Sequence, residues 1–123
     1  MDFASRPNLT VVGCSGSPGK AAHDVPLRMR EHGFPVTAVN PSLDAWEGEP
    51  AFRSLADAPR PDWVVVFRPS PETPAIAKEA VAAGAKGLWL QLGIANEEAR
   101  SIAEAAGLSF VQDKCVWVEF RNA

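Results

Sequence analysis

A glycine-rich segment near the N-terminus carries the residue types that bind phosphate. The segment 13–20, with the sequence GCSGSPGK, has a glycine at every third position and adds two serine hydroxyls and one lysine. Glycine tolerates positive φ and lets the backbone approach an anion closely. A helix that begins after such a loop directs free N–H groups at the same point. The segment therefore predicts a phosphate-binding loop.

Few other side chains could act as nucleophiles or proton carriers. Cys14 and Cys115 lie far apart and lack a CxxC spacing, so we expect two reduced, buried thiols and no metal site. His23 and His32 lie on or beside the first predicted helix without an acid or nucleophile at a useful spacing, and we expect packing or surface roles. Glu47 is expected to be a solvated surface residue. The sequence thus predicts no catalytic residues.

Composition and charge narrow the class of protein. The chain has 123 residues, 46% hydrophobic and 22% charged, which predicts a single soluble domain over residues 1–123. A formal net charge of -3 without a basic stripe predicts no binding to nucleic acid or membranes. No apolar run approaches the ~20 residues of a membrane span, and no signal peptide is recognisable, so we expect a cytoplasmic location. An anionic ligand would have to be held by backbone amides and a few local cations.

Short apolar runs alternate with amphipathic segments along the chain. The predicted strands are 9–12, 36–39, 62–67, 87–92 and 108–111. The predicted helices lie near 22–32, 73–83 and 96–106, with a short helix near 54–57. Residues before Asn8 predict a surface arm, and 115–120 fit either a strand or a helical turn. Pro26 fits the first helix only if it lies in the first turn.

This alternation predicts an α/β fold. We expect a Rossmann-like, doubly wound parallel sheet of about five strands in the order 3-2-1-4-5, with helices on both faces. The ligand crevice of such a sheet lies at the carboxyl ends of the strands, here at the switch between the first and fourth strands. The loops expected to meet there are 15–20, 40–41, 68–70 and 91–93.

Two common nucleotide sites are disfavoured by the same loops. The glycine spacing is GxxGxxG and not GxGxxG, and the second predicted strand ends in Asn40-Pro41, where a nicotinamide dinucleotide site carries an acid. The glycine-rich segment also lacks a GK[ST] ending, and no acid follows the third predicted strand to hold magnesium. These patterns disfavour both NAD binding and nucleoside triphosphate hydrolysis.

Five segments, taken in their order and spacing, resemble a known family. They are GCSGSPGK, VTAVNP, WVVVFRPSPE, GAKGLWLQLGIANEEA and VQDKCVWVE, and they extend from about Thr10 to Phe120. The chain resembles the small bacterial and archaeal coenzyme A-binding proteins, which are related to the N-terminal domain of the succinyl-CoA synthetase alpha chain. The second domain of that synthetase, with its phosphorylated histidine, and its nucleotide-binding partner chain have no counterpart in these residues. The resemblance thus extends to binding and not to ligase chemistry.

The resemblance implies a Rossmann-like domain that binds coenzyme A or an acyl-CoA without catalysis of its own. By position, it implies that a set of loop residues binds this ligand: Gly13, Ser15, Gly16, Ser17 and Lys20 along the phosphates, Asn40 and Pro41 at the adenosine end, and Phe67, Arg68, Pro69 and Gln91 beside the rest. Lys20 and Arg68 would neutralise phosphate charge.

Other functions stay open at this point. One is a small enzyme, acting on acyl-CoA or with NAD(P), that would depend on Cys14, His23 or Cys115. Another is a regulatory protein that reports coenzyme A to an unknown protein partner, for which Trp46 and Trp117 in irregular segments are the only hint. A third hypothesis is that one of the two cysteines forms a mixed disulfide with the thiol of the ligand.

Overall fold

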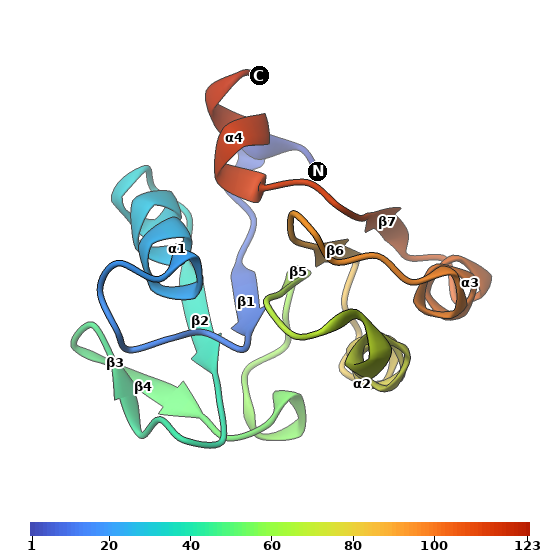
Figure 1. Cartoon of the computed structure of the whole chain (residues 1–123), viewed down its shortest axis with the longest axis horizontal. Coiled ribbons are helices and arrows are strands. Elements are labelled where there is room, and N and C mark those ends of the chain that lie inside the picture. The colour runs from blue at the N-terminus through green and yellow to red at the C-terminus, as the bar shows by residue number, and fades with distance from the viewer.

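The computed structural model describes residues 1–123 and contains one seven-stranded sheet. The strands are β1 (Leu9–Val12), β2 (Val36–Val39), β3 (Ala45–Trp46), β4 (Glu49–Phe52), β5 (Trp63–Val66), β6 (Gly87–Leu90) and β7 (Ser109–Val111). The helices are α1 (Ala21–Glu31), α2 (Thr73–Ala82), α3 (Glu97–Ala105) and α4 (Val116–Arg121). Figure 1 shows α1 and α4 on one side of the sheet and α2 and α3 on the other. This arrangement confirms the predicted doubly wound α/β fold.

The number and order of the strands differ from the prediction. The order is β3-β4-β2-β1-β5-β6-β7, and every pair except β3 with β4 is parallel. The β3–β4 hairpin occupies the edge beyond β2 where strand 62–67 was expected, and that strand, β5, pairs with β1 instead. The hairpin was missed because it is short and contains Gly48 and Pro50, which are typical of loops. The switch point consequently lies between β1 and β5.

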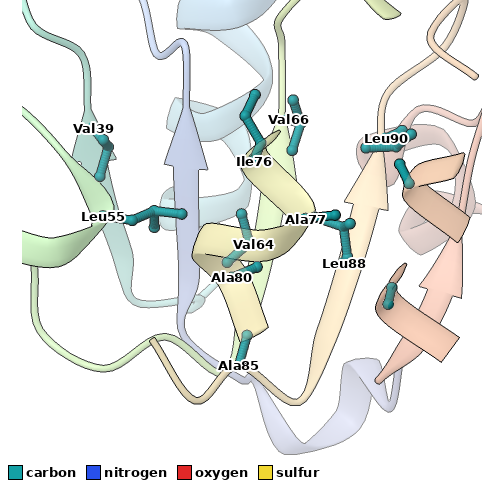
Figure 2. Packing of buried hydrophobic residues seen from close by; sticks show 12 residues of the cluster. Val39, Leu55, Val64, Val66, Ile76, Ala77, Ala80, Ala85, Leu88 and Leu90 are labelled. Carbon is teal, nitrogen blue, oxygen red and sulfur yellow. The ribbon is translucent and has the colours of Figure 1, made fainter. Parts of the chain in front are cut away.

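The central strands bury alternate side chains on opposite faces of the sheet. Val64 and Leu88 pack against α2 and α3, whereas Val65 and Trp89 pack on the face covered by α1 and α4. Figure 2 shows Ala77 of α2 directed at the strands beneath it. The small side chains Ala77 and Ala80 are fully buried, and they let α2 lie close to this face of the sheet. None of the helices combines the length and the apolar character that crossing a membrane requires.

Helix α1 contains Pro26 beyond its first turn, contrary to the expectation. Proline has no N–H group, so the carbonyl of Ala22, four residues earlier, loses its helical donor. The backbone N–H of Ser15 donates to that carbonyl at 3.0 Å. The proline thus leaves an acceptor that fastens the glycine-rich segment to α1, and this is how it is tolerated.

The two ends of the chain pack against each other. Phe3 lies in a 3-10 turn, and its ring centroid is 6.3 Å from that of Phe34 and 5.6 Å from that of Phe120. The guanidinium of Arg6 lies 4.9 Å from the centroids of both of those rings. The predicted surface arm thus lies at the surface, with Phe3 and Arg6 packed against the rest of the protein. Residues 115–120, which fitted either a strand or a helical turn, contribute to α4 and cover the arm.

Candidate functional site

A pocket of about 440 Å³ opens at the switch point, where β1, β2 and β5 end. The strand ends, the loops that follow them and one side of α2 line it: Val12, Gly13, Val39, Asn40, Pro41, Ser42, Arg53, Ser54, Leu55, Arg68, Glu72, Ile76 and Glu79. Its volume falls in the range of about 300–1,000 Å³ that is typical of small-molecule sites. The lining combines apolar side chains with two arginines and two glutamates, which suits a ligand with both apolar and charged parts.

The structure brings only some of the predicted site residues to this pocket. Gly13, Asn40, Pro41 and Arg68 line it. The remaining predicted residues line no pocket: Ser15, Gly16, Ser17, Lys20, Phe67, Pro69 and Gln91. Phe67 and Pro69 directly flank the lining residue Arg68, whereas Ser15, Gly16, Ser17 and Lys20 lie further along the loop that begins at Gly13.

Gly13 joins the loops after β1 and β5. Its φ is +85°, and a Cβ atom at this position would lie 2.7 Å from the carbonyl oxygen of Phe67. Its N–H donates to the carbonyl of Val39 at 2.9 Å. Asn40 adds a second link, because its Nδ2 donates to the carbonyl of Cys14 at 2.9 Å. These contacts fix the three strand ends around the pocket.

The glycine-rich segment retains donors that the protein does not use. Ser15 Oγ accepts the N–H of Ser17 at 3.0 Å, which stabilises the turn. The N–H groups of Gly16, Ala21 and Ala22 have no acceptor in the protein. Lys20 is exposed directly before α1 and forms no ion pair. Free amides and a cation at a helix start are the groups that bind an anion.

The two arginines of the pocket are held in exposed ion pairs. Arg68 Nη2 lies 2.9 Å from Glu72 Oε2, and Arg53 Nη2 lies 3.2 Å from Asp44 Oδ1. Arg68 donates to both carboxylate oxygens of Glu72, whereas Arg53 makes a single bond to Asp44. Both pairs are exposed to solvent, so an anionic ligand can compete with the carboxylates for the two guanidinium groups.

Gln91 holds the start of α4 and does not line the pocket. Its side chain is only 4% exposed, and its Oε1 accepts the N–H of Val116 at 2.9 Å. The indole N–H of Trp89 donates to the carbonyl of Lys114 at 2.7 Å beside it. Together these bonds fix the start of α4 at the carboxyl end of β6.

His23 is buried between two carboxylates, although the sequence had shown no acid at a useful spacing from it. Its Nδ1 is 2.7 Å from Asp24 Oδ1, and its Nε2 is 2.5 Å from Glu47 Oε1. These two hydrogen bonds raise the pKa of His23 above its ordinary value of 6.5, although burial opposes the change. Glu47 comes from the turn of the β3–β4 hairpin, which explains why sequence spacing did not reveal it. None of the three side chains lines the pocket.

The two cysteines are free and differ in their surroundings. Cys14 is fully buried, and burial, with a smaller contribution from the charge of Glu47, raises its pKa to about 12. A thiol with this pKa stays protonated at neutral pH and is a poor nucleophile. Cys115 is partly exposed and immediately precedes α4.

Some pocket residues were not found from the sequence. Residues 53–55 follow β4 and were missed together with the hairpin. Glu72, Ile76 and Glu79 lie on or just before α2 at spacings of four and three residues, which place them on one side of the helix. That periodicity was visible in the sequence and could have found them.

Comparisons with known proteins agree with this architecture. The family described as "CoA binding domain" matches residues 8–121. The uncharacterized protein YneT of Bacillus subtilis (strain 168) is 35% identical over 111 residues, which cover 89% of this chain and 82% of YneT. The structure of cell-free ID.343 from Thermus thermophilus is 34% identical with a TM-score of 0.90, covering 98% of this chain and 92% of that one. A hypothetical protein from Pyrococcus horikoshii OT3 is 30% identical with a TM-score of 0.93, covering 98% and 85%.

Proposed function

Because the chain belongs to the CoA binding domain family, we propose that residues 1–123 form one cytoplasmic domain that binds coenzyme A or an acyl-CoA and has no catalysis of its own. The observation that carries this proposal is the pocket at the switch point, with Arg53 and Arg68 in its lining. The three groups on which an enzyme was expected to depend, Cys14, His23 and Cys115, line no pocket. This placement favours binding over catalysis.

The charges and donors around the pocket suit the phosphates of coenzyme A. The protein has a net charge of -3, so it must attract a polyanion through local groups. Lys20, Arg53 and Arg68 supply cations, and the unused N–H groups at the start of α1 supply donors. We assign the phosphates of coenzyme A to the end of the pocket nearest these cations and N–H groups, with Ser15, Gly16 and Ser17 next to them.

The apolar part of the pocket suits the adenosine end of the ligand. Val39, Leu55 and Ile76 offer apolar surface next to Asn40 and Pro41, which border the adenosine in this proposal. Phe67 and Pro69 flank the rest of the ligand from the loop after β5, and Gln91 acts indirectly by holding α4.

A thermal-shift series tests the proposal. Selective binding to the native state raises the thermal midpoint with ligand concentration, so coenzyme A should raise it and NAD at equal concentration should not. No shift with coenzyme A, or equal shifts with both ligands, would contradict the proposal.

Calorimetric titration of two arginine variants localises the site. Arg68→Gln should weaken coenzyme A binding by about 10- to 150-fold, since a charge-assisted bond to phosphate contributes about 1.5–3 kcal/mol. Arg100→Gln is the matched control, because Arg100 is also ion-paired but lies on α3 away from the pocket. If the two variants bound coenzyme A with equal affinity, the ligand would not contact Arg68 in the loop after β5.

A further inference from the structure

The hydrogen-bond partners of His23 determine the protonation state of its imidazole ring. Both ring nitrogens face carboxylate oxygens, Asp24 Oδ1 at 2.7 Å and Glu47 Oε1 at 2.5 Å, and the residue is only 3% exposed. Ionised carboxylates accept hydrogen bonds and do not donate them, and a neutral imidazole has one donor only. Both bonds therefore exist together only when His23 is a doubly protonated imidazolium.

The first carboxylate connects His23 to the glycine-rich segment. Asp24 Oδ1, the atom that accepts from His23, also accepts the N–H of Gly19 at 3.1 Å. Hydrogen bonds from His23 and Gly19 lower the pKa of Asp24, in that order of size. The position of the turn at Gly19 thus depends on an oxygen that the imidazolium orients.

The second carboxylate connects His23 to the β3–β4 hairpin. Glu47 has a positive φ of 47° in the hairpin turn, a conformation that costs energy for a residue other than glycine. The adjacent Trp46 donates its indole N–H to the carbonyl of Ser15 at 2.9 Å. The hairpin therefore reaches the same glycine-rich segment from the other side.

The other charged groups around His23 are carboxylates and arginines, which are types of side chain whose ordinary pKa values lie far from neutral pH. Helix α1 contributes Asp24, Arg28 and Arg30, of which Arg30 donates to the carbonyl of Glu47 at 3.0 Å. The segment after β1 contributes Cys14, whose pKa of about 12 keeps it neutral. Arginine stays charged and carboxylates stay ionised in this range. Protonation of His23 therefore determines whether its hydrogen bonds to Asp24 and Glu47 can exist together.

We propose that His23 is a positioning residue whose bound proton holds the glycine-rich segment and the β3–β4 hairpin in the arrangement that binds coenzyme A, so that affinity falls as the proton is lost. The role in ligand affinity rests on the proposed function, whereas the positioning of the segment does not. His23 touches neither the pocket nor the phosphates in this proposal and acts through Asp24 and Glu47.

An NMR titration of the ligand-free protein tests the positioning role. The chain has two histidines, so His32→Gln assigns the ring signals of His23 without ambiguity. We expect the amide signal of Gly19 and the indole signal of Trp46 to shift with the same midpoint as His23. The proposal is overturned if both signals stay constant through that midpoint, or if His23 does not titrate while the protein remains folded.

Binding measurements test the coupling to the ligand. We expect wild type and His32→Gln to lose roughly three- to tenfold more affinity for coenzyme A than His23→Gln between about pH 6 and about pH 9. The phosphates of coenzyme A titrate in the same way whichever protein is present. The test is therefore the difference in pH-dependent affinity loss between His23→Gln and the other two proteins. By reciprocity, saturating coenzyme A should raise the midpoint of His23.

The outcomes separate the two proposals. Identical pH profiles in wild type and His23→Gln would overturn the coupling while leaving coenzyme A binding intact. Absence of binding at every pH would overturn the proposed function and the coupling, and the Gly19 and Trp46 signals would still decide whether His23 positions the segment.

Discussion

At the scale of single residues, Gly13 and Gly19 look alike in the sequence but differ in the space around them. Both have positive φ, +85° and +95°, yet a Cβ atom would collide with the Phe67 carbonyl only at Gly13. We expect Gly13→Ala to lower the free energy of unfolding by about 2–4 kcal/mol, since backbone strain and a clash combine. Gly19→Ala, with strain alone, should cost about 1 kcal/mol.

Urea denaturation of the two glycine variants checks this difference. Equal losses would show that the loop after β5 moves away from Gly13 without cost. Because Gly13 also lines the pocket, its alanine variant should weaken coenzyme A binding more than the Gly19 variant does.

The cysteines differ in predicted reactivity for the same kind of local reason. With an aromatic disulfide reagent at neutral pH, we expect Cys115 to react at least about 100-fold faster than Cys14, whose thiol is buried and protonated. Cys14→Ser and Cys115→Ser assign the two rates.

Mass spectrometry after incubation with coenzyme A disulfide should show no adduct on Cys14, and such an adduct would contradict the burial of Cys14 in the native state.

At the scale of elements, α1 and the β3–β4 hairpin are joined by His23, so their stability depends on pH. The raised pKa of His23 means that its contribution is complete below about pH 6.5 and is lost as the pH rises through the folded-state pKa. The lowered pKa of Asp24 means that its contribution is complete above its ordinary value of 3.8 and is lost as the pH falls through its folded-state pKa. The combined stabilisation is therefore greatest between these two ordinary values.

Denaturation of His23→Gln across the pH range measures this contribution. The loss of stability relative to wild type should be largest between about pH 4 and about pH 6.5 and should shrink at higher pH. His32→Gln is the matched control, because His32 forms no ion pair with a carboxylate. A loss that is the same at every pH would indicate that His23 contributes packing alone.

At the scale of the whole molecule, aromatic packing closes the chain ends over one face of the sheet. Phe120 on α4 contacts Phe3 and Phe34 and lies against the Arg6 guanidinium. Phe120→Ala should lower the free energy of unfolding by about 2 kcal/mol, less than for a fully buried phenylalanine because the ring is only partly covered. Leu92→Ala, at a side chain that is 70% exposed, should change it by less than about 0.5 kcal/mol.

Denaturant unfolding of both variants checks the role of the chain ends. If Phe120→Ala proved no more destabilising than the exposed-leucine control, α4 and the N-terminal residues would be separate from the cooperative core.

The central strands, helix α2 and the loops at the strand ends were predictable because short stretches of sequence determine them. The apolar runs at β1, β5 and β6 and the alanine-rich α2 predicted the α/β fold, since burial on both faces of a parallel sheet requires such runs. The strand ends then placed Gly13, Asn40, Pro41 and Arg68 at one edge, where they line the pocket.

The remaining features depend on contacts between distant segments, which no local pattern encodes. The β3–β4 hairpin exists because two short, loop-like segments find an edge beside β2, and that pairing brings Arg53 to the pocket and Glu47 to His23. The sequence by itself determined the α/β fold, the loops at the strand ends and the family resemblance. Only the tertiary structure decided that β5 pairs with β1, that Gln91 holds α4, and that the histidine near the glycine-rich segment carries two acidic partners. Strand pairing and burial are properties of the folded chain, and they alone determine which polar groups meet.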